Sequence, residues 1–172
     1  MNNDIILAEG IITKNGFVCG NHIAIDHGFY CTVDLILDNY IHIGPYCTMI
    51  GGKGVFVKME DYTSMAAGVR FICASLEHLG AGIPIPFLTE EYRDNLTSGN
   101  IVVKKFANVL TNAIVFPGVT LGEGSVISAG SIVTRDTDPW LIYAGNPARP
   151  VKERPKDKML ELAAKLEAEN AE

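Results

Sequence analysis

Aliphatic residues return at every sixth position through the C-terminal half of the chain. The run comprises Val103, Val109, Val115, Leu121, Ile127 and Val133. A helix repeats its apolar face about every 3.6 residues and a strand every 2 residues. A unit of six is too short for a helix and suits one brief strand followed by a corner.

The same period continues upstream in two other phases, from Leu7 to Met49 and from Met59 to Phe71. Over the three runs, 16 of 17 hexad starts are apolar and none is charged. In the last run, compact residues stand two places before each following start: Ala107, Ala113, Val119, Ser125, Ser131 and Thr137. A fixed short repeat predicts units that bury their apolar faces only by stacking on their neighbours.

We therefore predict a triangular prism, with three hexads to a coil and coils stacked by parallel strand pairing at about 4.8 Å. The alternative is an ordinary β-sandwich with accidental periodicity, which does not account for a period kept over so many positions. The repeat shifts phase near residues 51–54, which indicates a local bulge or small extra turn. It stops between about residues 76 and 100, a segment rich in Gly, Pro and charge that reads as a loop excursion.

The repeat ends near residue 137, so we divide the chain into 1–137 (the prism with its excursion) and 138–172 (a C-terminal segment). The latter contains the pattern of an amphipathic helix over residues 156–169, because apolar residues there follow helical spacing. These residues are Met159, Leu162, Ala163 and Leu166. We expect this helix to pack against the prism or against a partner subunit.

Charge and composition exclude several classes of protein. The net charge of −6 argues against a nucleic-acid surface. No apolar stretch is long enough to span a bilayer, and the N-terminus lacks the pattern of a signal peptide. The four cysteines are scattered, which favours reduced, buried thiols in a cytoplasmic protein.

The hexads VFPGVT-LGEGSV-ISAGSI, followed by VTRD and AGNPARPVK, resemble the hexapeptide-repeat acyltransferases. The resemblance covers roughly residues 37–154 and implies an all-β fold, a left-handed parallel β-helix. Within the family, LDNYIHIGPYCTMIGGKG, MEDYTSMAAGV and IYAGNPARPVKERPKDKMLEL look like the branch that acetylates nucleotide-linked amino-deoxy sugars. That branch serves bacterial surface-polysaccharide (O-antigen or capsule) synthesis.

The resemblance also implies a homotrimer that binds acetyl-CoA in grooves between subunits. By matched position, Thr111 and Ala129 hold the pantetheine arm, and Thr134 and Arg135 lie near the adenosine end. Arg149 and Lys152 match basic positions that meet the CoA phosphates. The chemistry agrees, because pantetheine amides pair with exposed backbone groups and phosphates favour Arg and Lys.

Acyl transfer from a thioester needs an uncharged nucleophile, and a histidine is the natural general base. Of the four histidines only His78 lies in the excursion, where the resemblance places a catalytic histidine, beside Glu77. Because a sugar amine is partly neutral at pH 7, His78 is a base, a substrate contact or neither. Glu77, Tyr92 and Arg93 are candidate contacts of the sugar or nucleotide, on their position in the loop.

Three alternatives stay open. O-acetylation of a sugar hydroxyl would depend more on a base, a non-enzymatic scaffold would not need the AGNPARPVK end, and the donor could carry a longer acyl group. A zinc enzyme of the same fold is not expected, although His22 and His27 have H-x4-H spacing, because residues 1–21 offer no third histidine. We expect no metal.

Overall fold

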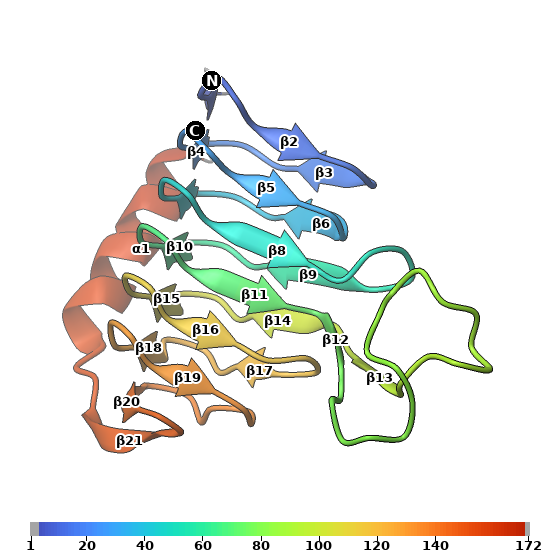
Figure 1. Ribbon diagram of the computed structural model, residues 1–172. Helices are drawn as coiled ribbons and strands as arrows, with labels where there is room; N and C mark the ends of the chain where they lie inside the picture. Colours follow the sequence, from blue (N-terminus) through green and yellow to red (C-terminus); the bar gives the residue numbers. More distant parts are fainter. Residues whose placement is uncertain (1–3, 171–172) are drawn as a thin grey trace.

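The computed structural model describes residues 4–170. The chain winds into a three-sided prism, and its short strands stack coil upon coil along the axis (Figure 1). Strands one coil apart pair in parallel and in register 18 residues apart, as Ile5 does with Ile23 and Ile23 with Ile41. The hexads predicted this parallel β-helix, and the left hand that the resemblance implied is also confirmed.

The first face of the prism is an eight-stranded sheet. Its strands are β1 (Ile5–Leu7), β4 (Ile23–Ile25), β7 (Ile41–Ile43), β10 (Ser64–Met65), β15 (Asn108–Val109), β18 (Val126–Ile127), β20 (Leu141–Gly145) and β21 (Ala148–Glu153). Six of the seven pairings are parallel, and β21 turns back antiparallel to β20 to form a hairpin at the lower end.

The second and third faces are sheets of six and five strands. The second contains β2 (Ile12–Thr13), β5 (Tyr30–Cys31), β8 (Thr48–Ile50), β11 (Arg70–Ile72), β16 (Ile114–Val115) and β19 (Ile132–Val133). The third contains β3 (Phe17–Cys19), β6 (Asp34–Leu37), β9 (Phe56–Met59), β14 (Ile101–Val103) and β17 (Thr120–Leu121). We call the turns from first to second face the first corner, from second to third the second corner, and from third to first the third corner.

The predicted hexad starts fill the interior. All six of the last run, from Val103 to Val133, are at most 2% exposed, and so are Met59, Met65 and Phe71. Their compact partners are also buried, because the triangular cross-section leaves no room for a second large side chain. Leu7 and Thr13 are exposed, since they lie in the top coil.

The cysteines are unpaired, and three of the four are buried. Burial raises the pKa of the Cys47 thiol to about 11 and that of the Cys73 thiol to about 12. The prediction of reduced, buried thiols holds for Cys31, Cys47 and Cys73, whereas Cys19 is half-buried. They pack as small apolar side chains.

Both predicted interruptions lie at the second corner. The first adds four residues around Gly52 and Gly54, both with positive φ, where the backbone N–H groups of Gly51 and Gly52 reach the Thr32 hydroxyl. The second is the excursion, which leaves the coil after Cys73 through β12 (Ala74–Leu76) and returns through the antiparallel β13 (Leu96–Ser98). The Gly99 N–H donates to the Cys73 carbonyl at 2.8 Å, so the coil closes beneath the loop.

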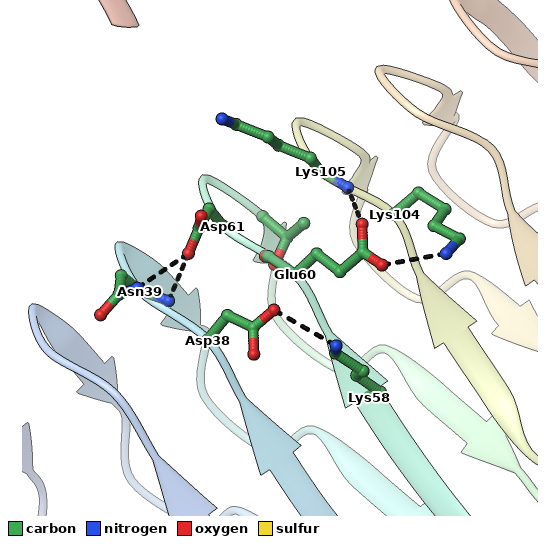
Figure 2. Close-up of polar contacts among 8 residues, drawn as sticks. Asp38, Asn39, Lys58, Glu60, Asp61, Lys104 and Lys105 are labelled. Atoms are coloured by element: carbon green, nitrogen blue, oxygen red, sulfur yellow. Dashed lines mark hydrogen bonds and ion pairs between the residues drawn. The ribbon is translucent and has the colours of Figure 1, made fainter. Parts of the chain in front are cut away.

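Polar side chains connect successive coils near the third corner. Asp61 accepts hydrogen bonds from the backbone and side-chain N–H groups of Asn39 at 2.7 and 3.0 Å (Figure 2). Figure 2 also shows Glu60 accepting from Lys104 Nζ and from the Lys105 backbone, and Asp38 paired with Lys58. The ammonium groups of Lys58 and Lys104 are therefore paired with carboxylates of the prism itself.

The helix α1 (Asp157–Asn170) runs back along the prism on the side away from the excursion (Figure 1). The predicted apolar stripe of Met159, Leu162, Ala163 and Leu166 faces Tyr62 and Phe106 across a hollow of about 330 Å³. The ion pair of Glu167 with Lys105 at 3.0 Å adds a polar anchor near its C-terminal end. Of the two placements predicted, the helix takes the one against its own prism.

Candidate active site

Thr111 and Ala129, the expected contacts of the pantetheine arm, lie one above the other on the first corner. They are 18 residues apart, and both are exposed. The Gly130 N–H donates to the Thr111 carbonyl at 2.9 Å, which joins the two coils here. An extended chain of amides can lie along this corner and pair with backbone groups that the strands leave unused.

Thr134, Arg135 and Arg149 line one hollow at the lower end of the prism. Its volume is about 210 Å³, and β19, the segment after it and the β20–β21 hairpin enclose it. Lys152 lies on β21 as well, exposed and opposite Ile142. The fold thus gathers three residues expected at the adenosine and phosphate end around one hollow, with Lys152 on the adjoining strand.

The neighbouring cations Arg154 and Lys156 have other partners. The Arg154 guanidinium donates to the carbonyls of Phe106 and Gly124 at 2.8 and 3.0 Å, and to Asn108 Oδ1 at 2.8 Å. Its partial burial lowers the pKa of this group, and its hydrogen bonds hold the end of β21 against the third corner. Lys156 lies over the Trp140 ring, 5.6 Å from its centre.

His78 follows β12 at the base of the excursion, exposed and with a positive φ of 56°. Glu77 beside it accepts a hydrogen bond from the Thr97 hydroxyl at 2.8 Å, so its carboxylate is held across the β12–β13 pair. Glu77 and Leu79 line a hollow of about 280 Å³ together with Phe116 of the coil below. His78 itself does not line this hollow, although the residues on both sides of it do.

Tyr92 and Arg93 lie farther out in the excursion. The Tyr92 ring is 56% exposed, and the Arg93 guanidinium approaches Glu90 at 3.9 Å. Neither residue lines the hollow beside Glu77, so the loop does not bring all the predicted acceptor contacts together.

Asp94 follows Arg93 in the excursion, and the sequence pattern did not predict its burial. It is 2% exposed and accepts one hydrogen bond, from the Asn95 N–H at 2.9 Å. Within residues 4–170 its other oxygen, Oδ2, has no hydrogen-bond partner, which is uncommon for a buried carboxylate. The burial of Asp94 and its unpaired oxygen become apparent only in the folded loop.

Within one chain, the expected base lies apart from the expected cofactor track. His78 leaves from the second corner, whereas Thr111 and Ala129 lie on the first corner, at the opposite edge of the second face. Over residues 4–170 no group of three or more His, Cys, Asp or Glu is placed to hold a metal ion. In the same part of the chain no helix is long and apolar enough to cross a membrane.

A parallel β-helix with a loop excursion and a basic hollow at its lower end is the architecture expected of the hexapeptide-repeat acyltransferases, and comparison with known proteins tests that expectation. No protein-family model matches the chain. It is 33% identical over 148 residues to the dTDP-4-amino-4,6-dideoxy-D-glucose acyltransferase of Escherichia coli, covering 83% of this chain and 74% of that protein. It is 31% identical over 138 residues to a probable macrolide acetyltransferase of Lysinibacillus sphaericus, covering 74% of this chain and 75% of that protein.

Among solved structures, it is similar to AntD, an N-acyltransferase from Bacillus cereus in complex with dTDP and 3-hydroxybutyryl-CoA. The sequence identity is 26% and the TM-score 0.81, over 97% of this chain and 85% of that chain. The chain therefore belongs to the hexapeptide-repeat acyltransferase family. It is an enzyme, an acyltransferase.

Proposed function

We propose that the enzyme transfers an acetyl group from acetyl-CoA to the amine of a nucleotide-linked amino-deoxy sugar. The observation that carries this proposal is the 33% identity to the Escherichia coli acyltransferase, whose name gives a dTDP-linked 4-amino sugar as substrate. The complex of AntD with dTDP and an acyl-CoA supports the same pair of substrates.

The cofactor would lie along the first corner, with its pantetheine amides beside Thr111 and Ala129. Its phosphates would meet Arg149 and Lys152 at the lower end, with Thr134 and Arg135 near the adenosine. Arg135 and Arg149 line one hollow. Charge-assisted hydrogen bonds from arginine to phosphate are among the strongest that proteins make.

In the chemical step, the lone pair of the neutral amine attacks the thioester carbonyl, a C–N bond forms and the carbonyl electrons move to oxygen. The tetrahedral adduct then collapses, the C–S bond breaks, and the CoA thiolate leaves. His78 would take the proton that the nitrogen loses, while Glu77, Tyr92 and Arg93 are candidate contacts of the sugar nucleotide. General-base assistance of this kind contributes about 10²–10⁴-fold to a rate.

The expected assembly is a homotrimer with active sites between subunits. The placement of His78 and of the Thr111–Ala129 track on opposite edges of one face supports it, because the excursion of one chain can then meet the first corner of the next. Both substrates are cytoplasmic metabolites, so we propose a cytoplasmic role in O-antigen or capsule synthesis.

A second candidate is O-acetylation of a hydroxyl acceptor. The 31% identity to a probable macrolide acetyltransferase favours it, since that acceptor is not a nucleotide-linked sugar. A hydroxyl is a far weaker nucleophile than a neutral amine at pH 7, so this reaction would depend strictly on a general base.

The test measures thiol release from acetyl-CoA and from 3-hydroxybutyryl-CoA, because AntD was solved with the longer donor. The acceptors are dTDP-linked amino sugars, free amino sugars and a macrolide, for the wild type, His78→Ala and the control His42→Ala on the first face. We expect turnover of acetyl-CoA with the dTDP-linked amines and a fall of about 10²–10⁴-fold for His78→Ala alone. Turnover restricted to hydroxyl acceptors would contradict N-acetylation, and full activity of His78→Ala would exclude His78 as the base.

A further inference from the structure

Six of the 14 lysines and arginines, all of which lie in the described part of the chain, form ion pairs with carboxylates. Lys58, Lys104 and Lys105 are bound to carboxylates (Figure 2 draws the first two pairs). Further ion pairs engage Arg93, Lys158 and Lys165. Among residues 4–170 no carboxylate pairs with the exposed Arg70 or with the exposed Lys14. An uncommitted guanidinium on a chain of net charge −6 is available to an anion.

Arg70 belongs to an outward-facing row of the second face. The register of β5, β8 and β11 sets Tyr30, Thr48 and Arg70 side by side on three successive coils. Arg70 Nη1 donates to the Thr48 hydroxyl at 3.4 Å, and Lys14 Nζ lies 5.2 Å from the centre of the Tyr30 ring. The row thus offers two cations, a hydroxyl and an aromatic ring over about three coils, whereas the next position below Arg70 is Ile114.

The corners on the two sides of this row carry further residues that bear on the proposed reaction. On the first corner, in the coil of Thr48, the Tyr46 ring is 62% exposed and contacts the His27 ring edge-on. On the second corner, in the coil of Arg70 itself, the chain leaves for the excursion that carries His78. The row therefore lies in the coils above the expected pantetheine track, and the excursion that carries His78 starts from the coil of Arg70.

The row is also separate from the basic hollow at the lower end. Arg135 follows β19, two coils below Arg70, and Arg149 lies on β21, four strands below the first-face strand β10 of the same coil as Arg70. At the spacing of paired strands these offsets correspond to roughly 10–20 Å along the axis. Two groups of cations at this separation suit two anionic substrates that are bound at the same time, with the reacting atoms between them.

We propose that Arg70, Thr48 and Lys14 bind the diphosphate of a nucleoside diphosphate-linked acceptor, with the rings of Tyr30 and Tyr46 beside its base or sugar. This inference rests on the proposed function and names the site of its second substrate. The guanidinium donates to phosphate oxygens, the Lys14 ammonium adds a second positive charge, and the Thr48 hydroxyl fixes the orientation of Arg70. The sugar then extends along the coil from Arg70 toward His78.

The test measures binding of dTDP, UDP and CoA to the wild type, Arg70→Met and the control Lys53→Met by calorimetry. Arg70→Met keeps the apolar stem and removes the charge, and Lys53 is an exposed cation on the second corner outside the row. We expect Arg70→Met to weaken dTDP and UDP binding by roughly 10- to 100-fold, the range of a charged hydrogen bond, with CoA binding unchanged. With a sugar-nucleotide acceptor, KM should rise by a similar factor while kcat stays within a few-fold.

Equal nucleotide affinity of Arg70→Met and the wild type would overturn the proposal, as would an equal loss of CoA affinity, which would assign Arg70 to the cofactor. The two proposals fail separately. A wild type that acylates free amino sugars and binds no nucleoside diphosphate contradicts this site and leaves acyl transfer standing. A wild type that binds dTDP through Arg70 and acylates no acceptor supports this site and contradicts the proposed function. Melting curves of both variants check that the prism is intact.

Discussion

The residues at the third corner adopt a left-handed backbone conformation that the sequence pattern did not predict. His22, Tyr40, Tyr62, Phe106 and Trp140 all have a φ near +60°, a region that non-glycine residues seldom occupy. The rings from His22 to Phe106 stack from coil to coil, at 4.5, 4.9 and 5.2 Å between successive centres. The Trp140 ring is tilted by 41° against Phe106, at 5.9 Å between centres. Stacking and burial against α1 offset the cost of the strained corner.

Gly124 takes the place of a ring at the third corner between Phe106 and Trp140. Because Gly124 has no side chain, the Trp140 ring can reach Phe106 across it. A Cβ at Gly124 would overlap the Trp140 ring, which crosses the corner there to reach Phe106. We expect Gly124→Ala to lower the free energy of unfolding by more than the roughly 1–2 kcal/mol that a positive φ costs alanine. The measurement is denaturant unfolding.

Gly130→Ala is the matched control, because Gly130 has a similar φ of 68° and open space where its Cβ would stand. The Gly124 substitution should therefore cost about 1 kcal/mol or more beyond the control, as overpacking does. Equal losses for the two variants would show that the ring contact carries no energy.

Among the elements, the coils of the prism close without the excursion, and the excursion is suited to binding. The coil beneath the loop is closed by the bond from Gly99 to Cys73, and β14 pairs with β9 and β17 without any contribution from the loop tip. The loop itself exposes large apolar side chains, among them Leu79 at 81% and Phe87 at 98%. A segment of this kind is suited to contact with a substrate or a neighbouring chain.

We expect replacement of residues 77–95 by a short glycine-containing turn between β12 and β13 to leave the prism folded and abolish acyl transfer. Shortening a loop changes the closure entropy only slightly, so the melting temperature should stay within a few degrees. Circular dichroism and thiol release check the two outcomes. A trimmed variant with full turnover would remove His78 and the loop from the mechanism.

For the whole molecule, the decisive question is how the two edges of the second face meet. We expect the mass in solution to be three times the 18.6 kDa of one chain, measured by light scattering. Because each active site would combine the excursion of one chain with the first corner of another, two inactive variants should complement each other. Co-expression of the trimmed variant with Ala129→Trp should restore about a quarter of wild-type activity, since a quarter of random neighbours are intact at both positions.

Mixed trimers without activity would show that each site lies within one chain, and a monomeric mass would contradict the assembly outright. Trimers of each variant alone serve as the control, and we expect them to be inactive.

Much of the architecture followed from the sequence because each hexad repeats one local constraint. An aliphatic residue at every sixth position must point inward, so Val103 to Val133 could be placed in the core before any coordinate was known. The four-residue insertion, the excursion and the amphipathic helix were visible as breaks in that period. The candidate site was less predictable, because its residues come from different coils. The row of Tyr30, Thr48 and Arg70 is scattered in the sequence and becomes a row only through the register of the strands.

The sequence by itself therefore determined the solenoid, its core, its interruptions and, through its motifs, its family, since these depend on short-range periodicity and local segments. Only the tertiary structure decided that α1 packs on its own prism, that Arg154 binds backbone carbonyls, and that Arg70 has no carboxylate partner among the described residues. The physical reason is that stacking brings together residues 18, 22 or 44 positions apart, and the insertions change that spacing from coil to coil. The partners of a side chain then depend on register, which no single stretch of sequence contains.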